Sequence, residues 1–217
     1  SEVYMKFFSI TFIIAGLIAF AVANDQFNKH RCTDDGCNDF YDGKVDTTPA
    51  PIVKIEPINY IVNTTGGKDV FVYSLSNCID HIYYEVPQEK RIPKALIIAQ
   101  AALETGWGTS RFANEGNNLF GIRTFNEDDE WLLPITWDQD KWIGWGVKVY
   151  DNKCDSVRDY VRILNEVWAY EDLREARDNG ADAYELADHL TLYASKPTYT
   201  KLVKQLIKYN IEGVYDI

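Results

Sequence analysis

The chain has 217 residues, a length that suits one folded domain with extensions. Its formal charge of −11 argues against nucleic acid as a partner, because phosphate binding needs a basic surface. The same charge disfavours long-range steering towards anionic polymers. Any such polymer must therefore be recognised by short-range contacts in a groove.

The first 23 residues are predicted to be a secretory signal peptide. Residues 1–4 precede the first methionine and are interpreted as an upstream remnant. A short basic start at residues 5–6 leads into an almost wholly apolar run at 7–22, and residues 21–23 form an Ala-x-Ala cleavage signature. An uncleaved anchor is the alternative, although the run is short for a bilayer. We expect an exported protein, periplasmic or extracellular, with no stable membrane insertion after cleavage.

Residues 24–69 are predicted to form an exposed leader that is rich in aspartate and contains prolines. The spacing of its acidic cluster does not match the calcium-binding loop of an EF-hand, so we interpret the cluster as solvated. Ile52 to Val62 alternates loosely between apolar and polar residues, which is typical of a strand or an extended strap.

Four cysteines in an exported chain indicate disulfides. Cys32 and Cys37 are close enough in sequence to close a small loop, which would leave Cys78 to pair with Cys154. The sequence does not choose among the three possible connectivities. A zinc site is the less favoured interpretation, because no pair of histidines stands near the short Cys-x4-Cys motif. We expect no metal and no cofactor.

The folded domain is predicted from residue 70 to residue 217. A first helix is expected from Ser74 to Glu85, with Pro87 breaking it. Pro93 then fits the start of a second helix, which is apolar nearly all round and so should be buried. Gly106 and Gly108 should end this helix, one of them in a left-handed cap. Two adjacent stripes of the helix are formed by Ile92, Leu96, Ala99 and Leu103, and by Ile97, Gln100, Ala101 and Glu104.

Glu104 stands in the last turn of this buried helix. The negative end of the helix dipole and burial both disfavour its charged form, so both raise its pKa. A carboxylic acid that stays neutral near pH 7 can act as a general acid. The alternative is a structural glutamate paired to Arg111 or Arg123, because ion pairs in a core also perturb pKa values.

The segments at 102–110 and 116–122 favour the catalytic interpretation. They read Ala-Leu-Glu-Thr-Gly-Trp-Gly-Thr-Ser and Gly-Asn-Asn-Leu-Phe-Gly-Ile. These segments resemble the glucosaminidase domain of glycoside hydrolase family 73, which includes bacterial autolysins and flagellar peptidoglycan hydrolases. Within that family, the closer resemblance is to the Bax-type members. In that family the glutamate before Thr/Ser-Gly-Trp-Gly is the catalytic acid, so the resemblance implies this role for Glu104.

The chain after Arg123 is predicted to form a small β-hairpin lobe and then helices. Residues 125–149 contain many acidic residues and four tryptophans, and apolar residues alternate between 143 and 149. Later helices are expected at Ser156–Trp168, Asp182–Leu192 and Thr198–Asn210. The resemblance implies an α+β, mostly helical, lysozyme-like fold in which the β lobe forms one wall of the cleft.

Glycosidic hydrolysis usually needs a second carboxyl group. The resemblance places it in the β lobe, where Asp138 is the nearest match and Glu130 is the other contender. The alternative is that both acids only solvate the lobe.

Residues 193–199, Tyr-Ala-Ser-Lys-Pro-Thr-Tyr, resemble a family motif whose tyrosine faces the acid across the cleft. This implies such a role for Tyr193, with Tyr199 as second choice. The alternative is that the two tyrosines simply pack at a helix junction. Trp107 and Asn118 are candidate substrate-binding residues, although both could instead build the turn behind Glu104.

The resemblance implies a monomeric peptidoglycan hydrolase that cleaves the β-1,4 bond after N-acetylglucosamine in wall glycan strands. A lytic transglycosylase on the same fold is one alternative, because that reaction needs a single acid/base and no water. A non-catalytic wall-binding module is the other.

Overall fold

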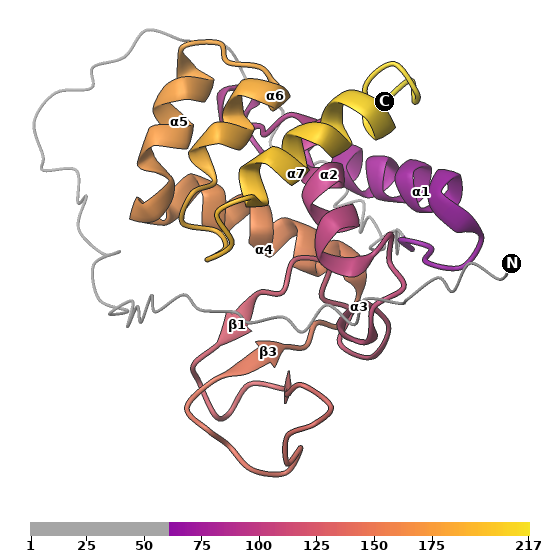
Figure 1. Ribbon diagram of the computed structural model, residues 1–217, viewed down its shortest axis with the longest axis vertical. Coiled ribbons are helices and arrows are strands. Elements are labelled where there is room, and N and C mark those ends of the chain that lie inside the picture. The colour runs from indigo at the N-terminus through magenta and orange to yellow at the C-terminus, as the bar shows by residue number, and fades with distance from the viewer. Residues whose placement is uncertain (1–60) are drawn as a thin grey trace, which may run out of the picture. The chain divides into compact units, whose positions relative to one another are not determined.

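The computed structural model describes residues 61–217 (Figure 1). The predicted signal peptide, most of the leader with its acidic cluster, and Cys32 and Cys37 lie outside these residues. Among the described residues, no helix combines the length and the apolar character needed to cross a bilayer.

The described part is mostly helical with a small antiparallel sheet, which confirms the predicted α+β class. Its longer helices are α1 (Gly67–Ile82), α2 (Lys94–Thr105), α4 (Lys153–Glu166), α5 (Glu171–Asp178) and α7 (Tyr199–Leu206). The shorter helices are α3 (Arg111–Glu115) and α6 (Ala183–Leu186). Single 3-10 turns lie at Gln88–Lys90, Trp168–Tyr170 and Ala187–His189, and a π-helical turn at Ile207–Ile211 extends α7.

Helix α2 is the centre of the core, as its apolar sequence predicts. Every residue from Leu96 to Ala102 is buried, and the helix packs against α1, α6 and α7 (Figure 1). Pro93 stands immediately before the helix, where its missing N–H leaves no hydrogen bond unmade. Gly106 ends the helix in the left-handed conformation, with φ of 59°. The predicted helix and its glycine cap are therefore confirmed.

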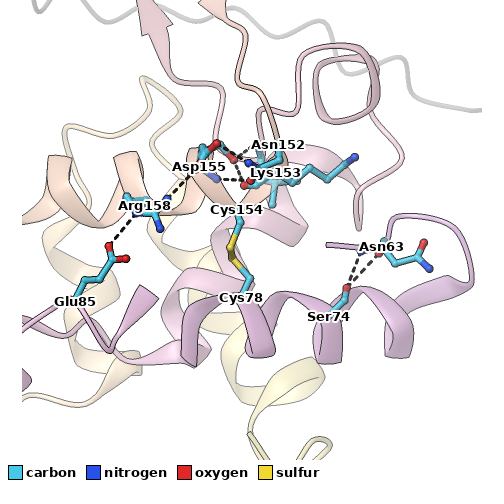
Figure 2. The surroundings of a disulfide bond; sticks show 11 residues. Asn63, Ser74, Cys78, Glu85, Asn152, Lys153, Cys154, Asp155 and Arg158 are labelled. Atoms are coloured by element: carbon cyan, nitrogen blue, oxygen red, sulfur yellow. Dashed lines mark hydrogen bonds and ion pairs between the residues drawn. A yellow bond between two sulfur atoms is a disulfide. The ribbon is translucent and has the colours of Figure 1, made fainter. Parts of the chain in front are cut away.

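A disulfide joins α1 to α4. Cys78 and Cys154 are bonded, with their Cα atoms 5.9 Å apart (Figure 2). This is the pair that would remain if Cys32 and Cys37 bonded to each other. Near it, the side chain of Asn152 accepts a hydrogen bond from the backbone N–H of Asp155 and so caps α4. The disulfide and the cap fix where α4 starts.

Helix α1 begins at Gly67 and ends at Ile82, so the predicted start at Ser74 and end at Glu85 were wrong. Gly66 and Gly67 fall in the predicted leader, but Gly66 takes a φ of 122° and directs the chain into the helix. The helix therefore begins within the residues assigned to the leader. Val62 is buried and Asn63 donates its N–H to Ser74, so this stretch is attached to the domain (Figure 2).

The β lobe has three short strands in the order β1-β3-β2, all antiparallel: β1 (Arg123–Thr124), β2 (Trp131–Leu132) and β3 (Gly146–Lys148). The predicted lobe is confirmed, although its regular part is much shorter than the alternation between 141 and 150 indicated. Gly146 allows the strands to approach, because a Cβ there would meet the Cβ of Trp131 at 2.5 Å.

The remaining helices differ from their predictions mainly at the ends. Helix α4 starts three residues before the predicted Ser156 and ends at Glu166. The predicted 182–192 helix is α6 followed by a 3-10 turn that ends at His189. Helix α5 was not predicted, because Leu173 is its single buried residue and leaves no apolar period.

Candidate active site

Glu104 lies at the C-terminal end of α2, in the last turn before Gly106, which caps the helix. Gln100, Ala101 and Ala102 of the preceding turn are buried, whereas Glu104 itself is partly exposed. Glu104 therefore lies at the edge of the core, and its carboxyl group is strongly desolvated. Burial raises the pKa of Glu104 to about 7, and a hydrogen bond from Tyr199 acts in the opposite direction. The group is thus a mixture of acid and carboxylate at neutral pH.

Tyr199, the first residue of α7, is the tyrosine that contacts Glu104. Its hydroxyl donates a hydrogen bond of 2.8 Å to Oε1 of Glu104. Burial, followed by the charge of Glu104, raises the pKa of Tyr199 well above its usual value, so the phenol stays a neutral donor. A donor in this position stabilises the carboxylate that remains after Glu104 has given up a proton.

The ring of Tyr193 packs against the ring of Tyr199. The two rings are stacked, with centroids 5.4 Å apart and planes 14° apart. The hydroxyl of Tyr193 donates to the backbone carbonyl of Phe120 at 2.7 Å. The structure thus places the second-choice tyrosine against the acid and the first-choice tyrosine one ring away.

Sequence reasoning missed two buried residues, Gln100 and Tyr160. Nε2 of Gln100 donates to the hydroxyl of Tyr199 at 2.9 Å, and the hydroxyl of Tyr160 donates to Oε1 of Gln100. Gln100 is one turn before Glu104 and is fully buried. A polar side chain on an otherwise apolar helix, four residues from the acid, was the signal that could have found it.

Asn118 shapes the turn that follows α3. It is 1% exposed, and its amide nitrogen donates to the carbonyls of Ile122 and Lys148 at 2.9 and 2.8 Å. Its Oδ1 accepts from the backbone N–H groups of Phe120 and Ile122. These bonds tie the turn to β3 and hold Gly121, whose φ is +65°, beside Oε2 of Glu104.

Trp107 lies just beyond the end of α2, with φ of 63°. Its ring meets the ring of Phe71 edge to face at 6.3 Å, and the ammonium of Lys68 lies 4.6 Å from its centroid. These contacts attach the turn to the start of α1. In this arrangement Trp107 supports the end of α2.

The two β-lobe acids, Asp138 and Glu130, are both exposed. Oδ1 of Asp138 accepts the backbone N–H of Asp140 at 3.3 Å, and the backbone carbonyl of Glu130 accepts the N–H of Val149. Within residues 61–217, neither side chain is hydrogen-bonded to Glu104 or Tyr199. Both acids remain candidates carried by a lobe with little regular structure.

The ion-pair interpretation of Glu104 finds no support among the described residues. Nε of Arg111 pairs with Glu115 at 2.6 Å, and another of its nitrogens donates to the carbonyl of Leu133. The guanidinium of Arg123 lies over the ring of Trp145, 3.9 Å from the centroid. Glu104 faces neutral phenols instead of a cation, which is why burial dominates its pKa.

Comparison with known proteins assigns the chain to a class. Residues 80–212 match the glucosaminidase family, described as mannosyl-glycoprotein endo-beta-N-acetylglucosaminidase. This range is more than half of the 217 residues, and the chain belongs to that family. The resemblance that the sequence carried around Glu104 is therefore confirmed.

Particular relatives include proteins named peptidoglycan hydrolase FlgJ. The peptidoglycan hydrolase FlgJ of Vibrio parahaemolyticus is 33% identical over 131 residues, which are 57% of this chain and 42% of that protein. FlgJ of Escherichia coli K12 is 28% identical over 171 residues, 72% and 51% of the two chains. The chain thus spans about half the length or less of these relatives. The solved catalytic domain of the autolysin Auto from Listeria monocytogenes is similar with a TM-score of 0.48 and 22% identity, over 64% of this chain and 82% of that one.

Proposed function

We propose that this protein is an exported, monomeric peptidoglycan hydrolase that cleaves the β-1,4 bond after N-acetylglucosamine, with Glu104 as the general acid. The observation that supports this proposal best is the environment of Glu104. Burial raises its pKa to about 7, and Tyr199 donates to one of its oxygens at 2.8 Å. Membership of the glucosaminidase family and the FlgJ relatives support the substrate class.

In the proposed reaction, neutral Glu104 gives its proton to the glycosidic oxygen as the bond to the sugar breaks. The sugar ring develops oxocarbenium-like positive charge, while the departing sugar leaves as an alcohol. The carboxylate formed on Glu104 keeps the hydrogen bond from Tyr199, which is stronger to a charged acceptor than to a neutral one. Tyr193 holds Tyr199 in place through their stacked rings.

A water molecule must then attack the sugar, and a base must take its proton. We keep Asp138, with Glu130 as the other contender, as the proposed base. Both are exposed acids on the β lobe, which is the wall that the family resemblance assigns to the second carboxyl group. The β lobe would have to bring one of them to the water when substrate binds.

The test is digestion of purified peptidoglycan by the wild type and by Glu104→Gln, followed by borohydride reduction and mass analysis of new chain ends. We expect reduced N-acetylglucosamine ends from the wild type and a loss of at least about a hundredfold in rate for Glu104→Gln. Glu175→Gln, an exposed glutamate on α5, is the matched control and should keep full activity.

Three other outcomes would each reject part of this proposal. Ends with a 1,6-anhydro ring would make the protein a lytic transglycosylase. Reduced N-acetylmuramic acid ends would move the cleaved bond to the other sugar. No cleavage by the wild type, together with unchanged wall binding by Glu104→Gln, would make it a binding module.

A further inference from the structure

Three hydrogen bonds in a row connect α4 to Glu104 through the core. The hydroxyl of Tyr160 donates to Oε1 of Gln100, and Nε2 of Gln100 donates to the hydroxyl oxygen of Tyr199 at 2.9 Å. The hydroxyl of Tyr199 donates in turn to Oε1 of Glu104 at 2.8 Å. Tyr160 and Gln100 are fully buried and Tyr199 is 6% exposed, so water does not compete for these groups.

We call these three hydrogen bonds the relay. Tyr160 determines which group donates and which accepts in each of them. Burial raises its pKa well above the usual value, so it is a neutral phenol with one proton to donate. If the amide of Gln100 were rotated, its nitrogen would face Tyr160, whose proton would be left in the core without its acceptor. The rotated amide would also present its oxygen to Tyr199, and the phenolic proton would then leave Glu104. Both phenolic protons have an acceptor when Tyr199 donates to Glu104.

The two oxygens of Glu104 are therefore not equivalent. Oε1 accepts a hydrogen bond from Tyr199, whereas Oε2 lies on the side of Gly121, where an added Cβ would be 3.8 Å away. We propose that the relay from Tyr160 through Gln100 to Tyr199 confines the acidic proton of Glu104 to Oε2, which makes Gln100 and Tyr160 positioning residues for proton donation. This deepens the proposed function and rests on it.

The tyrosines around Glu104 keep their protons across the working pH range, so the hydrogen bonds of the relay persist. The titratable groups that face Glu104 are Tyr199 on α7, Tyr193 in the segment before α7, and Tyr160 on α4. Burial raises the pKa of all three tyrosines well above the usual value, so all three remain neutral. Among the described residues, none of the causes that shift the pKa of Glu104 is a second charged side chain.

The test compares Tyr160→Phe, Tyr199→Phe and the double variant. Phenylalanine keeps the ring of Tyr160 stacked on Phe120, where the centroids are 4.1 Å apart, so the fold should survive. Tyr83→Phe is the matched control, because it removes another buried hydroxyl, one that donates to the carbonyl of Ile92 and takes no part in the three hydrogen bonds from Tyr160 to Glu104. The readouts are the carbon-13 titration of the Glu104 carboxyl and the dependence of kcat and KM on pH.

Tyr199→Phe should raise the pKa of Glu104 by about one unit, because the charged form loses its donor. Tyr160→Phe should raise it by a smaller amount in the same direction and lower kcat on the order of tenfold with little change in KM. The double variant should match Tyr199→Phe alone, since both changes act through the same hydrogen bond. Tyr83→Phe should leave the titration and the pH profile unchanged.

The relay would be overturned if Tyr160→Phe kept both the wild-type pKa of Glu104 and the wild-type turnover. It would also be overturned if the effect of Tyr160→Phe on the pKa of Glu104 simply added to that of Tyr199→Phe. Gln100→Met gives a second route to the same answer, because it removes the amide and should also raise the pKa of Glu104. The titration needs no substrate. Failure of the wild type to cleave peptidoglycan would therefore reject the proposed function while the relay is still measured.

Discussion

Burial disfavours the charged form of Glu104, and one of its oxygens, Oε2, lies on the side of Gly121. Gly121 adopts a φ of +65°, and a Cβ would lie 3.8 Å from Oε2 of Glu104, in ordinary contact. A methyl group there would occupy the space through which a sugar oxygen would reach the proton. Under the proposed function, a side chain at position 121 would therefore affect both catalysis and backbone strain.

Gly121→Ala should therefore lose activity out of proportion to its loss of stability. Alanine at positive φ costs about 1 kcal/mol of folding free energy. Gly213→Ala is the control, because Gly213 has a φ of +73° and nothing within 4 Å of the added Cβ. Thermal unfolding should show similar small losses for both variants, while turnover should fall only for Gly121→Ala. Equal turnover in the two variants would show that the space beside Oε2 is not used.

The predictability of the site also differs residue by residue. Glu104 could be found because the dipole and burial arguments follow from its place on an apolar helix. Tyr193 was placed ahead of Tyr199, whereas Tyr199 is the tyrosine bonded to Glu104. The residues alone do not settle this order, because it depends on how the chain turns at Pro197 before α7. Gln100 and Tyr160 are 60 positions apart, and only the folded core brings them together.

Among the elements, α2 was predicted well because its apolar period, its proline and its glycine all indicate the same bounds. Helix α1 was predicted too late in the chain, because Gly66 and Gly67 were assigned to the leader. The β lobe was placed correctly but its strands are shorter than the alternation indicated, since turns and tryptophan contacts take up the rest. Such irregular segments have no period from which their bounds can be read.

The disulfide between α1 and α4 should be a major source of stability. It closes a loop with a sequence separation of 76, for which the chain-entropy relation gives about 4 kcal/mol. The double variant Cys78→Ala/Cys154→Ala should lower the melting temperature by roughly 10 °C or more. Each single variant would leave a free thiol, so the double variant is the cleaner comparison. An unchanged melting temperature would mean that the core holds α1 and α4 together without the bond.

For the whole molecule, the charge of −11 bears on the proposed substrate, a wall that carries peptide carboxylates. Like charges repel at long range, and salt screens that repulsion within about 8 Å at physiological ionic strength. Binding of Glu104→Gln to purified peptidoglycan should therefore become stronger, by about two- to threefold, between 10 and 150 mM salt.

Weaker binding with rising salt would instead indicate a local basic contact. The outer face of α7 is where we would look for it. Lys201, Lys204 and Lys208 line a shallow hollow of about 290 Å³ there, although Lys204 is already paired with Asp188 at 2.5 Å. Reversal of the salt effect by Lys201→Ala/Lys208→Ala would identify that contact.

The most direct measurement is the carbon-13 titration of the Glu104 carboxyl in the wild-type protein. The pKa should lie near 7, raised from an ordinary value of 4.5 by burial. Because the acid form is the proton donor in the proposed reaction, turnover should fall as the pH rises through that value, and the two curves should share one midpoint. A carboxyl that titrates near 4.5, or a turnover that stays constant well above pH 7, would contradict the account.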